Sequence, residues 1–177
     1  PDRATSIAQH LLSAGRACPA DRAASAALEA ARETEALLAD DEARTWARRA
    51  VDALDTAPGR APEAWRLRCE AELLVATASR NLAERDAATE AVQRVVAEAR
   101  AHGDGVLLAS AAEEAALSVA GVGFSFGIVD EDVLALLDEA RSLLPDGHDA
   151  EMVSLLAWTS IALNSSPDRS RQSELAG

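Results

Sequence analysis

Residues 21–38 read DRAASAALEAARETEALL, and this stretch decides the fold class. Its apolar residues recur at steps of three and four, which is the spacing of one side of an α-helix. Asp21 is a favourable residue for capping the start of that helix. The apolar stripe consists of Ala24, Ala27, Leu28, Ala31 and Leu38.

Alanine-rich helices of this kind recur along the chain. We expect the first helices of successive hairpins to open near Asp21, Ala61, Gly105 and Asp149, which lie 40, 44 and 44 residues apart. This period is typical of helical-hairpin repeats, in which each unit buries its apolar stripe against the next unit. The sequence therefore predicts one all-α domain over residues 1–177, a tetratricopeptide-like, right-handed stack of about four antiparallel hairpins.

The helices between these openings have amphipathic patterns of their own. A short first helix is expected over 4–14, with Ile7, Leu11 and Leu12 on one side and Gly15 as its stop. Further helices are expected over 42–54, 62–79, 84–102 and 106–119, and a last full helix holds Met152, Leu155, Leu156, Thr159 and Leu163. No stretch alternates with period two for long enough to predict a strand.

Two of these helices carry further information. The helix over 62–79 is apolar on two faces, which indicates a helix held between neighbours. Another helix follows Asp130, which we expect to act as its cap. The stripe of this second helix consists of Val133, Leu136, Leu137, Ala140, Leu143 and Leu144.

The charge balance argues against direct nucleic-acid binding. All 17 basic residues are arginines, against 30 acidic residues, and the formal net charge is −13. A nucleic-acid backbone needs a basic stripe that releases counterions, and none is present. We expect most of the carboxylates to lie on solvated faces of surface helices.

The cysteines and the apolar runs indicate a cytoplasmic protein. Cys18 and Cys69 are too few and too far apart for a disulfide framework or a thiolate metal site. No apolar run approaches the roughly 20 residues that cross a bilayer, and no signal-peptide pattern opens the chain. Because it begins at Pro1 without a methionine and stops at Gly177 in a polar, helical-looking stretch, we expect a fragment of a larger protein.

No motif predicts an enzyme, a metal or a cofactor. A P-loop needs a lysine after its glycines, and this chain has no lysine. The histidines do not share ligand spacing on one helix, and Cys69 lies on an apolar stripe as a packing thiol. For Glu113 and Glu114, a solvated face or an arginine partner is favoured over acid–base catalysis. The histidines are His10, His102 and His148.

Aromatic residues are the remaining candidates for binding. Phe124 and Phe126 lie in a glycine-rich loop, where they either anchor a partner or cap the open end of the stack. Trp46, Trp65 and Trp158 lie on apolar stripes, so core packing is favoured over a ligand-binding groove. The candidate binding residues for a protein partner, a second copy or a small-molecule effector are Phe124, Phe126, Trp65 and Trp158.

Two resemblances follow from these patterns. Residues 41–54 resemble the second helix of a tetratricopeptide unit, with Ala43, Ala47 and Ala50 at its small positions, although the Trp-Leu-Gly-Tyr set of the first helix is missing. On a longer scale, five segments occur in an order that resembles the helical-repeat region of large ATP-binding LuxR-type bacterial transcriptional regulators and of related antibiotic-pathway regulators. These segments are 7–12, 46–54, 98–104, 129–147 and 167–171.

The longer resemblance implies a role in sensing. In that family the repeat region is thought to bind an inducer or a protein partner and to relay the signal to NTPase and DNA-binding domains. Neither of those domains has its motif in this chain, and no functional residue can be carried across. A generic protein–protein adaptor or oligomerisation module is the alternative, since the same repeats would serve it equally well.

Overall fold

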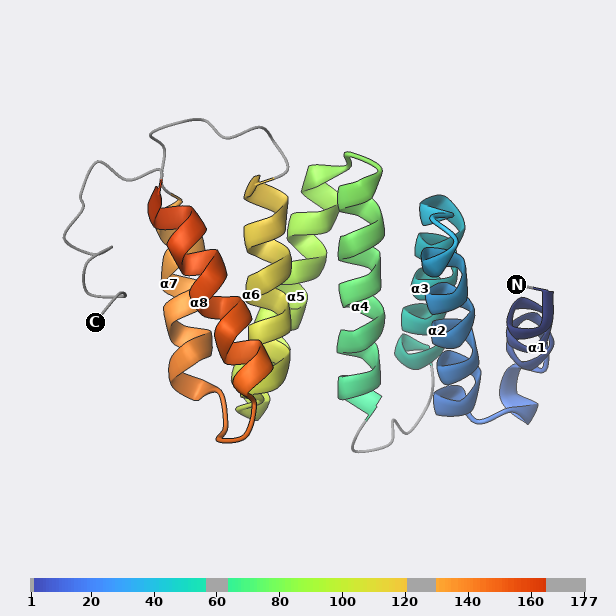
Figure 1. The fold of residues 1–177 in the computed structure, drawn as a ribbon. Helices are drawn as coiled ribbons and strands as arrows, with labels where there is room; N and C mark the ends of the chain where they lie inside the picture. The colour runs from blue at the N-terminus through green and yellow to red at the C-terminus, as the bar shows by residue number, and fades with distance from the viewer. Residues whose placement is uncertain (1, 57–63, 121–129, 165–177) are drawn as a thin grey trace. The chain divides into compact units, whose positions relative to one another are not determined.

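The computed structural model describes residues 2–56, 64–120 and 130–164, and these residues are all-α, as the sequence predicts (Figure 1). No strand occurs in those three ranges. The elements are α1 (Asp2–Ser13), η1 (Gly15–Ala17), α2 (Ala20–Ala36), α3 (Asp40–Asp55), α4 (Ala64–Asn81), α5 (Arg85–His102), α6 (Gly105–Ala120), α7 (Glu131–Leu143) and α8 (Asp149–Asn164).

The chain forms two compact units, which we call the N-terminal unit (residues 1–94) and the C-terminal unit (residues 95–177). The boundary falls inside α5. The helices α2, α4, α6 and α8 begin at Ala20, Ala64, Gly105 and Asp149, so successive starts are 44, 41 and 44 residues apart. The expected opening at Ala61 lies outside the described residues, and the other expected openings agree within one residue.

In the N-terminal unit, α1 packs on α2, α2 packs on α3, and α3 packs on α4. The interior is mostly alanine, and small side chains let helix axes come close together. Ala24, Ala27, Leu28 and Ala31 are buried, as the stripe predicts. Leu38 was expected on the same stripe and is not there: α2 ends at Ala36, and Leu38 is 83% exposed in the following turn.

The start of this unit corrects two further expectations. Ile7 is 45% exposed, because α1 turns Ala4 and Ala8 toward the core and those small residues allow the closer approach. Asp21 does not cap α2, since Pro19 occupies the cap position and Asp21 lies in the first turn. A carboxylate in that turn still interacts favourably with the helix dipole.

One turn geometry recurs at three helix ends. At Leu38, Ala83 and Gly103 the backbone has φ of 59°, 61° and 64°, the left-handed conformation that favours glycine. The next N–H in each turn donates five residues back, as in Ala39 N–H to the Thr34 carbonyl oxygen at 3.0 Å. This is the Schellman pattern, which satisfies carbonyls at the end of a helix. Only Gly103 carries the glycine that would reveal the turn in the sequence.

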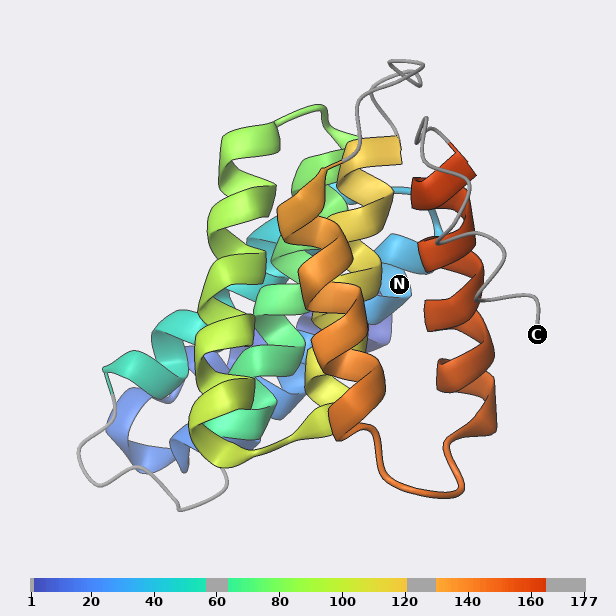
Figure 2. The ribbon, with the colours of Figure 1, turned by 90° about the vertical axis from the view of Figure 1, so that its left-hand side faces the viewer.

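In the C-terminal unit, α6, α7 and α8 pack against one another (Figure 2). Asp130 caps α7 as expected, because its Oδ1 accepts hydrogen bonds from the backbone N–H groups of Asp132 and Val133, both at 3.1 Å. Leu143 was expected on the buried stripe but is 49% exposed at the last residue of α7. Leu134 is buried although the predicted stripe did not include it.

Candidate binding pocket

A pocket of about 910 Å³ lies in the N-terminal unit. Its walls come from α1 and η1, from the start of α2, and from the C-terminal half of α3. Pockets of this size suit small organic ligands. The polar and charged residues of the lining are Gln9, Ser13, Arg16, Asp21, Arg49, Asp52 and Thr56.

The connection from α1 to α2 shapes one side of the pocket. Gly15 has φ of 52°, which lets the chain turn out of α1 into η1. Cys18 is extended, and Pro19 follows with φ of −55° and leads into α2. The Cys18 thiol donates to the Pro19 carbonyl oxygen at 3.4 Å. The connection therefore passes along the pocket instead of closing a tight hairpin turn.

The opposite wall is a face of α3. Arg49 donates a hydrogen bond to Gln9 Oε1 at 3.0 Å, and its guanidinium lies over the Trp46 ring, 4.6 Å from the ring centroid. Asp52 lies three residues further along the same helix face. The Thr56 hydroxyl donates to the Asp52 carbonyl oxygen at 2.7 Å. Arg49 is thus held by two neighbours, whereas the Asp52 carboxylate faces the pocket without a partner among the described residues.

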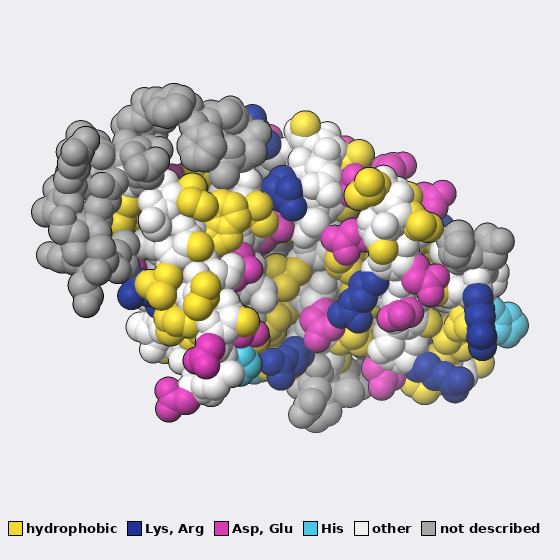
Figure 3. All heavy atoms as spheres, in the orientation of Figure 1, with side chains coloured by type: hydrophobic (Ala, Val, Ile, Leu, Met, Phe, Trp, Pro, Cys, Tyr) yellow, Lys and Arg dark blue, Asp and Glu magenta, His cyan; other side chains and the backbone are white. Residues whose placement is uncertain are grey.

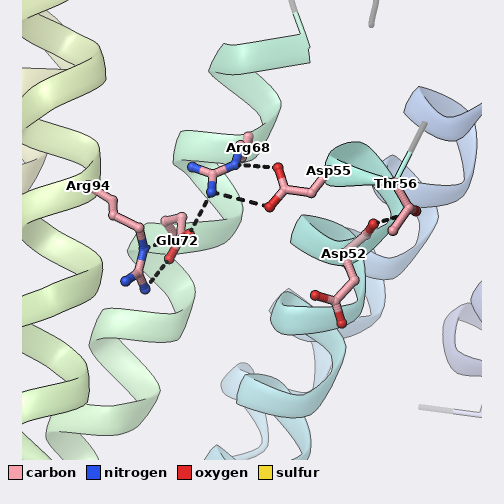
Figure 4. Close-up of polar contacts among 6 residues, drawn as sticks. All are labelled: Asp52, Asp55, Thr56, Arg68, Glu72 and Arg94. Atoms are coloured by element: carbon pink, nitrogen blue, oxygen red, sulfur yellow. Dashed lines mark hydrogen bonds and ion pairs between the residues drawn. The ribbon is translucent and has the colours of Figure 1, made fainter. Parts of the chain in front are cut away.

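A chain of ion pairs begins on the same last turn of α3. Figure 4 shows Asp55 pointing toward Arg68 on α4, while Asp52 reaches none of these ion-pairing side chains. Arg68 Nε donates to Asp55 Oδ1 at 2.9 Å and its second nitrogen lies 3.5 Å from Glu72 Oε1. Arg94 on α5 then holds both oxygens of Glu72, each at 2.9 Å. We call these four residues, Asp55, Arg68, Glu72 and Arg94, the arginine ladder.

Glu72 is the buried member of the ladder, with 3% of its surface exposed. A buried carboxylate must be paired and hydrogen-bonded to remain charged at low cost, and two arginines provide this. Sequence reasoning missed the residue, although one signal was present: Glu72 lies four residues after Arg68 inside a helix that is apolar on two faces. The ladder therefore joins α3, α4 and α5 within the N-terminal unit.

Other polar bridges follow the repeat period. They join residues 38 to 41 positions apart, and they link helices that occupy equivalent places in successive hairpins. In the N-terminal unit the bridges are Gln9–Arg49, Arg32–Glu70, Asp40–Asn81 and Arg44–Glu84, and in the C-terminal unit the bridge is Arg100–Glu139. The spacing supports the repeat period independently of the helix starts.

The Arg100–Glu139 bridge is the most perturbed of these pairs in its titration. Arg100 donates to both oxygens of Glu139, at 2.9 and 2.6 Å. These hydrogen bonds, and then the arginine charge, lower the pKa of the Glu139 carboxyl from its ordinary value, against a smaller effect of burial. The pair joins α5 to α7.

The candidate aromatic residues do not line the pocket. Trp65, in the first turn of α4, and Trp158, on α8, are each half-buried and belong to different units. Phe124 and Phe126 lie outside the described residues. Trp46 is half-buried and packs on the core of the N-terminal unit. The pocket itself, assembled from a helix end and a turn, left no periodic signal in the sequence.

The comparisons with known proteins add no relative. Neither protein-family models, nor curated proteins, nor solved structures match this chain. Within residues 2–56, 64–120 and 130–164, no cluster of three histidine, cysteine or carboxylate side chains is placed to hold a metal ion. None of the described helices combines the length and the apolar character needed to cross a membrane.

Proposed function

We propose that this chain is the sensing region of a bacterial transcriptional regulator, in which tetratricopeptide-like stacked hairpins bind an effector in the pocket of the N-terminal unit. The observation that carries the proposal is the pocket of about 910 Å³, which has both apolar walls and unpaired charges. The resemblance to the repeat region of LuxR-type regulators supports the regulatory role. The net charge of −13 assigns DNA binding to another domain.

The arginine ladder suggests how binding in the pocket is relayed. Asp52 and Thr56 line the pocket, and Asp55 on the same turn of α3 begins the ladder to α4 and α5. A ligand that shifts this turn changes the ladder geometry. An effector acts only through its different affinity for the two arrangements of the ladder.

A matched pair of variants tests the effector site. Thr56→Trp fills the pocket from its rim, whereas Thr45→Trp changes an exposed threonine of the same helix that does not line it. Both hydroxyls donate to a carbonyl oxygen four residues earlier, so the local helix loses the same bond in each variant. In the complete regulator, Thr56→Trp is expected to abolish the effector response of a reporter gene, while Thr45→Trp keeps it. Equal responses would refute the proposal.

A second candidate function is self-association through α8 in a generic adaptor. Figure 3 shows hydrophobic side chains over α8, where Val153 is 65% exposed and Ile161 is 39% exposed. Residues 152–163 carry no charge. An exposed apolar face of this kind marks an interaction surface. Sedimentation velocity of the wild type and of Val153→Arg distinguishes the two: a dimer that the variant dissociates favours the adaptor, and a monomer in both excludes self-association through this face.

A further inference from the structure

The pocket offers a ligand more negative charge than positive charge. Asp21 and Asp52 have carboxylates with no hydrogen-bond or ion-pair partner among the described residues, and so does the Arg16 guanidinium. The other cation, Arg49, is held by Gln9 and by the Trp46 ring. Two carboxylates and one guanidinium therefore remain available to a ligand.

The apolar walls of the pocket are aliphatic. Leu11, Leu12 and Leu54 line it together with alanines, and its lining contains no aromatic side chain. A planar ring would find no stacking partner there, whereas an alkyl or alicyclic body can bury its surface against the leucines. The shape and chemistry thus favour an aliphatic ligand body.

The field of the whole chain acts in the same direction. The formal net charge is −13, so a cation is attracted to the surface and an anion is repelled over about one Debye length, ~10 Å at 0.1 M salt. A phosphate or carboxylate ligand would have to overcome this field with Arg16 as its one available guanidinium. A cationic ligand meets two carboxylates.

We propose that the pocket binds a small amphipathic ammonium ligand, with its aliphatic body against Leu11, Leu12 and Leu54 and its nitrogen donating hydrogen bonds to the carboxylates of Asp21 and Asp52. The inference rests on the proposed function and gives the chemical class of the effector. Charge-assisted hydrogen bonds of this type are stronger than neutral ones, so the ammonium group selects the ligand. Arg16 disfavours a second cationic group near η1.

Three probes of equal length separate the alternatives. Amide chemical shifts of the purified chain are followed by NMR as hexylammonium, hexanoate or hexanol is added at the same ionic strength. Hexylammonium is expected to shift amides around Ser13, Ala53 and Thr56, with a dissociation constant on the order of 1 mM, which is ordinary for so small a probe. Hexanoate and hexanol are expected to bind at least about tenfold more weakly.

Charge-neutralising variants test the named carboxylates. Asp52→Asn and Asp21→Asn should each weaken hexylammonium binding about threefold or more, and the double variant about tenfold or more. Glu42→Gln, an exposed carboxylate on α3 that does not line the pocket, is the control and should leave binding unchanged. A general effect of net charge would move all of the variants alike and would overturn the assignment.

The outcomes also distinguish this inference from the proposed function. If hexanoate or hexanol binds in the pocket as tightly as hexylammonium, the ammonium class is wrong while the pocket remains a ligand site. If none of the probes shifts the pocket amides and no effector acts on the complete regulator, both proposals fail. Binding of hexylammonium that is insensitive to Asp21→Asn and Asp52→Asn also refutes the ammonium contact.

Discussion

The N-terminal unit and the C-terminal unit bury different side chains. Among the described residues, the N-terminal unit encloses mostly alanine with two buried leucines, Leu28 and Leu54, whereas the C-terminal unit encloses six. Hydrophobic stabilisation scales with buried apolar area, so each alanine contributes little. The N-terminal unit instead has the arginine ladder and four polar bridges of one repeat period. The buried leucines of the C-terminal unit are Leu107, Leu108, Leu134, Leu137, Leu155 and Leu163.

The comparison teaches that one repeat pattern can be stabilised in two ways. Alanine contacts leave the register of neighbouring helices weakly specified, because small side chains interlock little, and polar pairs at defined positions supply the missing specificity. Leucine contacts specify the register by their shape. Mutations should therefore act through packing in the C-terminal unit and through charge in the N-terminal unit.

The largest effect is expected from Leu137→Ala in the C-terminal unit. Leu137 is fully buried, so the change removes buried area and leaves a cavity, which costs about 4 kcal/mol of unfolding free energy. Urea unfolding is followed by Trp158 fluorescence in a background with Trp46→Phe and Trp65→Phe. Leu143→Ala, at an exposed site on α7, should cost below about 1 kcal/mol. Equal losses would remove leucine packing as the basis of this unit.

Gly105→Ala is expected to cost about 3 kcal/mol in the same unit. A Cβ at this first residue of α6 would overlap the backbone carbonyl of Leu143, and backbone cannot move aside cheaply. Without that contact, replacing glycine by alanine in a helix stabilises by up to about 1 kcal/mol. The sign of the change in melting temperature therefore decides the matter: an increase would show that α6 and the end of α7 are not in close contact.

In the N-terminal unit, Glu72→Gln is expected to cost about 2 kcal/mol. The amide keeps the shape but removes the charge that two arginines surround. Glu70→Gln is the matched control on the same helix, because its partner Arg32 and Glu70 itself are both well exposed, and it should cost below about 0.5 kcal/mol. Unfolding is followed by Trp46 and Trp65 fluorescence in a Trp158→Phe background. Similar costs for both variants would contradict the role given to the ladder.

Leu38→Gly is expected to stabilise the N-terminal unit by about 1 kcal/mol. The residue has φ of 59° and is 83% exposed, so glycine relieves backbone strain and little packing is lost. The neighbouring Leu37 is also exposed but has φ of −93°, and Leu37→Gly should give no gain. The midpoints of chemical unfolding compare the two. A loss of stability in Leu38→Gly would mean that its side chain packs on the unit.

The smallest effect is expected from pH. The pKa of Glu139 is lowered in the folded protein by the hydrogen bonds from Arg100, so the pair stabilises the fold above the ordinary pKa of 4.5. That contribution is lost as the pH falls below 4.5 through the lowered pKa of the folded state. Glu139→Gln should therefore lower stability at pH 7 but not at the acid end. A stability difference that is independent of pH would contradict the ion pair.

Much of the fold was predictable because its signals are local. The starts of α6 and α8, the Asp130 cap and the buried stripe Ala24, Ala27 and Leu28 follow from spacing within one or two turns of helix. The turn at Gly103 was also signalled by its glycine. Leu38 and Ala83 adopt the same conformation without such a signal, because tertiary packing of the hairpin outweighs their backbone preference.

The candidate site was not predictable in this way. Sequence reasoning ranked Trp65 and Trp158 as binding candidates, since large aromatics are common in recognition surfaces, but neither lines the pocket. The pocket is lined by residues as far apart as Gln9 and Thr56, which meet only when α1 and η1 lie across from α3. No spacing rule covers such pairs.

The sequence by itself determined the helical class, the repeat period near 40 residues and the acidic surface, because propensity, apolar spacing and charge are properties of neighbouring residues. Only the tertiary structure decided which polar residues are buried and which remain available. Glu72 became the buried member of the ladder because arginines from two helices reach it, while Asp21 and Asp52 stayed unpaired beside the pocket. That distinction depends on distances between helices, which are set by packing.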